Sequence, residues 1–413
     1  MRAAFSFSAE RSVSMRVVLL GGDLNAYAVA ISFHETFGVR STVFCRYPCG
    51  ITSTSSIVCV RVIPSLLEDS VGTEALIGFA KKESEMPYLI PCGDWYVSFL
   101  DRNRDTIGAY YKFLIPPSDI LATVTEKASF YALLSREGLP YPKTVVLTKE
   151  ALTLTRLLAV GDYPAVLKPS NSTAYYAHPF EGMRKVYFPR CPKDALSIAE
   201  RIYESGYNGA LILQRRIGKG GTAIARTLTL CLDKESRVRR GVLGEILIEE
   251  TAAGARGNYA AILSRPPDAL TCRIISLLEK MKYVGLANVD ILSDQDASYI
   301  LELNPRQGRS ADYLRAAGVS LARFLIDAIE GRPMVTDLSS RASVWHAVPM
   351  ATVMHLVGKA HKKTVARLAR EGRATSVFSY KEDQKNIKRR IYVAIHAIRR
   401  SSALRRRGKS DDR

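Results

Sequence analysis

The chain has few of the patterns that disulfide scaffolds, zinc sites and membrane spans require. Its seven cysteines are scattered over 413 residues without a CxxC pair, and there are only six histidines. Neither a disulfide framework nor a zinc site is therefore indicated. No apolar run reaches the length of a membrane-spanning helix, because the most apolar candidate, 344–357, is broken by His346, Pro349 and His355. These absences favour a soluble protein of the reducing cytoplasm.

We expect no secretion signal. Residues 1–14 have no apolar core of signal-peptide length and no cleavage pattern. Met15 directly precedes the first clear strand, so Met1 and Met15 both stay open as the start of the protein.

Positive charge is abundant and lies mainly at one end. The net charge is +19, and residues 359–413 hold eighteen Lys or Arg against five Asp or Glu. Between Lys388 and Arg400, apolar and basic residues alternate at helical spacing, which predicts a basic amphipathic helix suited to an anionic membrane surface. A solvated basic terminus is the alternative, and nucleic acid is the less favoured partner. We expect removal of residues 380–413 to reduce binding to anionic vesicles and to spare any catalysis with soluble substrates.

The N-terminal part predicts an α/β domain. A strand, a glycine turn, a helix and a second strand are indicated at residues 16–20, 21–22, 26–37 and 41–45. A glycine turn after the first strand is typical of doubly wound folds, but the GxGxxG pattern of dinucleotide binding is missing.

A candidate metal site lies between two short strands. Glu302 and Asn304 are two residues apart in an extended stretch, so both side chains leave the same face. Asp290 ends an apolar run twelve residues before Glu302, and the polar residues 293–297 predict a hairpin turn that brings the two carboxylates together. Carboxylate and amide oxygens suit Mg2+ or Mn2+. The alternative is a set of solvated strand ends.

Two basic residues extend this site toward phosphoryl chemistry. Arg306 offers a fixed guanidinium to a transferring phosphoryl group. Lys168 is the only charge in the apolar stretch 163–169, and burying it requires an anionic partner such as a nucleotide phosphate. A lysine that reaches solvent from a strand end is the alternative.

Two loops are candidate binding segments. Residues 171–185 are polar, aromatic and irregular, and we expect them to close over the phosphates as a lid; His178 in this loop is given no catalytic role. The glycine-rich residues 251–259 offer Arg256 and Asn258 as a grip for a carboxylate or phosphate, or form a plain flexible loop.

One set of residues resembles the metal-binding end of the ATP-grasp superfamily. It consists of an acid, a Glu-x-Asn motif and an arginine, at Asp290, Glu302, Asn304 and Arg306. The resemblance implies an α/β ATP-grasp fold with an N-terminal Rossmann-like (pre-ATP-grasp) domain and a basic C-terminal helical tail. ATP and Mg2+ are the implied cofactors. The implied domains are the Rossmann-like domain, the central subdomain, the C-terminal subdomain and the tail, at residues 15–118, 119–212, 213–335 and 336–413.

The same resemblance implies roles in nucleotide binding. Lys127, at the start of a predicted helix, and Lys168 would reach the nucleotide, together with Asn304. Gln214, Arg215 and Ile217 fall in the hinge that contacts the adenine, but Arg215 stands where many relatives have Glu. Without the resemblance, Lys127 would be read as an ordinary surface residue.

Three segments narrow the resemblance within the superfamily. They begin at Lys168, His178 and Leu303, and they are similar to bacterial carboxylate-amine ligases of the D-aspartate ligase type. Such ligases join the β-carboxylate of D-aspartate to a lysine amine of a peptidoglycan precursor. The implied reaction passes through an acyl phosphate stabilised by Arg306, while Arg256 and Arg309 are candidates for binding the substrate carboxylate.

Two other functions stay open at this point. One is an ATP-grasp ligase for another amino acid or a peptide. The other is a nucleotide-binding protein without catalysis that holds a membrane through its tail.

Overall fold

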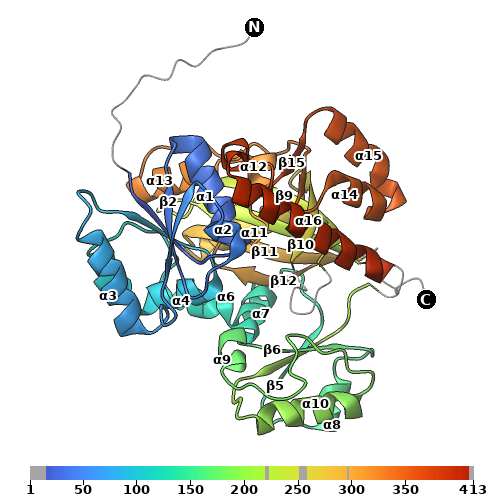
Figure 1. The fold of residues 1–413 in the computed structure, drawn as a ribbon. Helices are drawn as coiled ribbons and strands as arrows, with labels where there is room; N and C mark the ends of the chain where they lie inside the picture. Colours follow the sequence, from blue (N-terminus) through green and yellow to red (C-terminus); the bar gives the residue numbers. More distant parts are fainter. Residues whose placement is uncertain (1–14, 219–222, 251–257, 295–296, 409–413) are drawn as a thin grey trace.

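The computed structural model describes residues 15–218, 223–250, 258–294 and 297–408. Three sheets organise the molecule: a four-stranded sheet, a three-stranded sheet and an eight-stranded sheet (Figure 1). The mixed α/β architecture expected from the sequence is confirmed.

The N-terminal sheet is parallel, as expected of a Rossmann-like domain, with the strand order β3-β2-β1-β4. Its strands are β1 (Val17–Leu20), β2 (Ser41–Cys45), β3 (Val58–Val62) and β4 (Tyr88–Pro91). Its helices are α1 (Leu24–Phe37), α2 (Gly50–Ser53), α3 (Asp69–Ala80), α4 (Asp94–Arg102) and α5 (Arg104–Gly108). The segment that forms α2 and β3 gave no clear signal in the sequence.

The turn after β1 places an acidic side chain at the start of α1. Gly21 has φ +125, and a Cβ there would lie 3.2 Å from the Tyr96 ring. Glycine avoids both the backbone strain and the contact. Asp23 then caps α1 by accepting a hydrogen bond from the Asn25 amide. On its other side α1 shares a core with α13 (Leu321–Glu330), which fixes this domain against the rest of the chain.

The middle of the chain builds the small antiparallel sheet β5-β7-β6. Its strands are β5 (Thr144–Leu147), β6 (Val166–Pro169) and β7 (Leu211–Gln214). The helices are α6 (Ser118–Thr125), α7 (Lys127–Arg136), α8 (Leu154–Leu158), α9 (Ser172–Tyr176) and α10 (Pro192–Glu204). The segment that we expected to be irregular, 171–185, contains the short helix α9, because Asn171 caps it by accepting from the Ala174 amide.

The large sheet has the order β12-β11-β8-β9-β10-β14-β15, with β13 beside β9. Its strands are β8 (Ile224–Leu232), β9 (Val238–Glu249), β10 (Tyr259–Arg265), β11 (Gly285–Ser293), β12 (Ser298–Asn304), β13 (Asp337–Leu338), β14 (Val344–His346) and β15 (Ala374–Ser376). α11 (Ala269–Lys280) and α12 (Tyr313–Ala316) accompany it. α12 ends before α13 begins, because Gly318 turns the chain between them with φ +86.

The C-terminal segment is part of the folded body, whereas we expected a separable tail. β14 pairs with β10, and β15 pairs with β14. The helices are α14 (Met350–Leu356), α15 (Lys359–Arg370), the 3-10 helix η2 (Lys381–Lys385) and α16 (Ile387–Gly408). The basic helix predicted near Lys388 is thus present. The division of the chain into four domains stays a prediction.

Candidate active site

A cavity of about 600 Å³ opens where the three sheets meet. Its walls come from the start of α4, the residues around α9, the β11–β12 hairpin and the segment 305–311. Lys127, Asn258, Asp290, Glu302, Asn304, Arg306 and Arg309 all line it, so most of the residues selected from the sequence come together.

The predicted hairpin forms with the expected register. β11 and β12 are antiparallel, with Asp290 opposite Glu302 and Asn288 opposite Asn304. Tyr259 donates a hydrogen bond to Asp290 over 3.2 Å. Burial, with the nearby charge of Glu302, raises the pKa of Asp290 to about 7.

Cations surround the second carboxylate. Lys127 Nζ lies 3.5 Å from Glu302 Oε2. Although burial opposes the charge of Glu302, Lys127, Lys185 and Lys168 hold its pKa well below the ordinary range. Lys185 also lines the cavity, at the end of the segment that we expected to act as a lid.

The donor set fits a hard divalent cation. Two carboxylates opposite each other at low exposure repel. A divalent ion between them would remove this repulsion, which raises the pKa of Asp290 in addition to the effect of burial. Within the described residues, no group of three or more His, Cys, Asp or Glu could hold a metal. Two carboxylates and one amide are instead the sparse set of Mg2+, which keeps waters and phosphates as its other ligands.

Lys168 is partly buried and is not among the residues that line the cavity. Its Nζ lies 3.1 Å from the Tyr131 hydroxyl. Burial lowers the pKa of Lys168 to about 8, against the opposing charge of Glu302. A partly buried lysine whose charge is this weakly compensated suits an incoming phosphate.

Arg306 is held by a residue from the N-terminal domain. Its Nη2 donates to Asp94 Oδ2 over 2.8 Å, and its Nη1 donates to the Gln307 carbonyl over 3.1 Å. Burial works against its charge, but Asp94 raises the pKa of Arg306 above its ordinary value. The guanidinium is therefore a fixed cation beside Asn304, 3.4 Å from its Oδ1.

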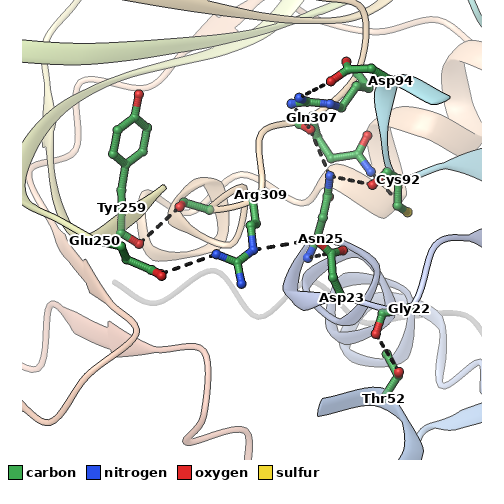
Figure 2. Close-up of polar contacts among 12 residues, drawn as sticks. Gly22, Asp23, Asn25, Thr52, Cys92, Asp94, Glu250, Tyr259, Gln307 and Arg309 are labelled. Carbon is green, nitrogen blue, oxygen red and sulfur yellow. Dashed lines mark hydrogen bonds and ion pairs between the residues drawn. The ribbon is translucent and has the colours of Figure 1, made fainter. Parts of the chain in front are cut away.

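Arg309 lies between an acidic residue that precedes α1 and another that follows β9. Figure 2 shows it between Glu250 and Asp23, with separations of 3.5 Å and 3.6 Å. Glu250 is buried and also pairs with Arg400 of α16. Two cations and two carboxylates thus form a charged wall next to the cavity.

The three hinge residues are not among those that line the cavity. Gln214 is buried and donates to Thr144 Oγ1 over 2.8 Å. Arg215 donates to the Tyr299 hydroxyl over 2.8 Å and lies over its ring, and Ile217 is buried. Arg215 is thus engaged within the protein, and the adenine contacts stay a prediction. Arg256 lies outside the described residues.

Several residues of the site were missed from the sequence. Lys185 is the last residue of the segment 171–185, which we expected to close over the phosphates. Its positive charge in that segment was the signal that could have identified it. Asp94 lies 212 residues from Arg306, and Glu250 lies 59 residues from Arg309. No local pattern connects such distant pairs.

Known proteins resemble this chain over most of its length, although no family model matches. The D-aspartate ligase of Enterococcus faecium (strain Aus0004) is 32% identical over 389 residues, which are 90% of this chain and 91% of that protein. The carbamoyl phosphate synthase large chain of Myxococcus xanthus (strain DK1622) is 26% identical over 52% of this chain and 19% of its own.

Solved structures share the fold at low identity. The biotin carboxylase domain of the Hydrogenobacter thermophilus 2-oxoglutarate carboxylase has a TM-score of 0.61 and 15% identity, covering 80% of this chain and 73% of that one. An N5-carboxyaminoimidazole ribonucleotide synthetase has a TM-score of 0.59 and 15% identity, with 83% and 84% covered. The first is a complex with MgADP and the second a complex with ADP.

Proposed function

Because the chain belongs to the D-aspartate ligase family of ATP-grasp ligases, we propose that it joins D-aspartate, or a similar amino acid, to an amine at the expense of ATP. The reaction is that of an ADP-forming carbon-nitrogen ligase. The observation that carries the proposal is the cavity in which Asp290, Glu302 and Asn304 meet Lys127 and Arg306.

The metal and the phosphates would occupy the hairpin end of the cavity. Asp290, Glu302 and Asn304 would hold Mg2+ or Mn2+, which when bound offsets the negative charge of the nucleotide phosphates. Lys127, Lys168 and Lys185 would hold those phosphates. The likeness to complexes with ADP supports this assignment, as does the charge around Glu302.

The proposed reaction has two steps and passes through an acyl phosphate. A carboxylate oxygen of the amino acid attacks the γ-phosphorus of ATP, and ADP leaves. The amine then attacks the acyl carbon, loses a proton, and phosphate leaves with the original carboxylate oxygen as the amide forms. Arg306, fixed by Asp94, would stabilise charge on the transferring phosphoryl group.

The charged wall around Arg309 supports an amino acid as the acid substrate. Arg309, with Arg256, would bind a carboxylate. Asp23 is half-exposed opposite Arg309 and offers an acceptor for an ammonium group. D-aspartate carries both kinds of group. Asn258, which lines the cavity, would add a polar contact.

The amine acceptor and the place of action belong to the same proposal. A peptidoglycan precursor with a free lysine amine is the acceptor, as in the reaction of D-aspartate ligases. The enzyme works in the cytoplasm, at the inner face of the membrane. The positive charge of residues 359–413 supports contact with anionic lipid there.

Release of ADP tests the function. We expect release that requires Mg2+, D-aspartate and a precursor amine together, measured across D- and L-amino acids. A different amino acid giving the highest rate would transfer the proposal to that substrate. Nucleotide binding without amine-dependent release would replace the ligase with a protein that only holds nucleotide.

A further inference from the structure

The helix α16 has two unlike faces. On one face Arg389 and Leu404 are buried against the body. On the other, four isoleucines lie along one stripe, because residues four, eight and eleven positions apart share a helix face. They are Ile387, Ile391, Ile395 and Ile398, with exposed fractions of 70%, 56%, 46% and 68%. We call these four residues the isoleucine stripe.

Basic side chains border this stripe. Those that are exposed are Lys388, Arg390, Arg399, Arg405 and Arg406. The 22 residues of α16 include no Asp or Glu, so no acid within the helix offsets them. Figure 1 shows α16 running as a long helix toward the C-terminus.

We propose that α16 docks on an anionic bilayer, with the isoleucine stripe at the acyl boundary and the basic residues among the headgroups. This deepens the proposed function, on which it rests for the location at the inner membrane face. An exposed apolar stripe with cationic borders is the pattern of a helix that lies in a membrane interface. Within the described residues, no helix is long and apolar enough to cross a bilayer.

The charges select lipid over a second copy of the chain. Pairing two α16 helices through their stripes would bring two sets of basic borders together, with no acidic residue from either helix between them. Like charges at such an interface are destabilising. Anionic headgroups, in contrast, meet every one of those side chains with opposite charge, and each contributes while it remains within the screening length.

Docking through α16 would also bring the membrane close to the part of the active site proposed to bind the amino acid. Arg400 lies on the inner side of the same helix and pairs with Glu250, which in turn contacts Arg309. The helix is therefore connected to the charged wall through side-chain contacts, and an acceptor held at the membrane would find the site nearby.

Vesicle flotation of the full-length protein tests the proposal. Vesicles of phosphatidylglycerol and phosphatidylcholine in equal parts are compared with phosphatidylcholine alone. We expect binding only to the first. Ile391→Ser/Ile395→Ser should weaken it by about tenfold, because less apolar surface enters the bilayer. Val335→Ser, at another exposed apolar residue, is the matched control and should bind as the wild type does.

A second pair of variants tests whether binding depends on the basic residues of α16 or on the positive charge of the protein in general. Arg390→Gln/Arg399→Gln should weaken binding by about tenfold as well. Lys362→Gln/Lys363→Gln removes the same charge from the neighbouring basic helix α15 and should have a smaller effect. Equal losses from both pairs would overturn docking through α16.

Two further results would contradict the proposal. Unchanged flotation of the isoleucine variant is one. The other is a wild-type dimer in light scattering that becomes a monomer in this variant, which would assign the stripe to a second copy. ADP release with soluble substrates should be equal in all variants. Its failure in the wild type would count against the ligase and not against docking.

Discussion

At the level of single residues, Glu302 has the most direct part in the proposed site. It lies opposite Asp290 and is surrounded by Lys127, Lys168 and Lys185. We expect Glu302→Ala to abolish ATP turnover with Mg2+, because the cation loses a carboxylate and the phosphate site gains uncompensated positive charge. ADP release measures turnover and circular dichroism checks the fold. Glu74→Ala, at an exposed position of α3, is the control. Turnover near the wild-type rate would remove the metal assignment.

The charge of Lys168 is expected to make the KM for ATP depend on pH. Burial lowers the pKa of its ammonium group to about 8. The charged form therefore predominates below this pH and is lost as the pH rises through it. We expect the KM for ATP to rise by roughly tenfold between about pH 7 and about pH 9.

The arginine variant is the control for this titration. Lys168→Arg stays charged throughout that range, so its KM for ATP should stay flat even if the rate is lower. An identical rise in KM in this variant would show that another group titrates.

Among the helices and strands, the β11–β12 hairpin was predictable because its signals are local. Two apolar runs, a polar turn and the spacing of Asp290 and Glu302 are contained in a short stretch. The helix α16 was predicted for the same reason, but its attachment to the folded body was not. Its anchor is Asp383, which accepts hydrogen bonds from Tyr27 and Ser56, 356 and 327 residues away. Removal of residues 380–413 is therefore expected to destabilise the protein, in contrast to the expectation from sequence.

The buried ion pair beneath α16 gives a test of stability. Asp383 and Arg389 are both 0% exposed, and their facing atoms are 3.2 Å apart. We expect Asp383→Ala to lower the free energy of unfolding by about 3–5 kcal/mol, because Arg389 is left as an uncompensated buried charge. Urea denaturation measures the change. Glu382→Ala, at the adjacent exposed residue, should change it little. A similar loss in both variants would contradict the role of the pair.

Arg400 connects α16 to Arg309, the residue proposed to bind the substrate carboxylate, through Glu250. It shares Glu250 with Arg309, so Arg400→Met should leave Glu250 to draw Arg309 toward itself. We expect the KM for the amino acid to rise by about tenfold while the KM for ATP stays unchanged. Arg399→Met, one exposed position before it, should change neither value. A parallel rise in both constants would indicate a general structural effect instead.

For the whole molecule, the sequence predicted individual residues of the proposed site better than the contacts between distant segments that bring them together. The proposed metal ligands and Lys168 follow from patterns within single segments, whereas Lys127 was indicated only by the family resemblance. The pairing of Asp94 with Arg306 joins the start of α4 to the segment that follows β12. Such contacts arise from tertiary packing, which local spacing does not encode. The adenine contacts expected of Gln214, Arg215 and Ile217 also stay a prediction.

The proposed site, where the three sheets meet, would activate a carboxylate as an acyl phosphate. The most direct measurement uses D-aspartate labelled with oxygen-18 in its carboxylates, together with ATP, Mg2+ and a peptidoglycan-precursor amine. We predict that mass spectrometry finds labelled oxygen in the released phosphate along with an amide product. Amide formation with entirely unlabelled phosphate would contradict the account.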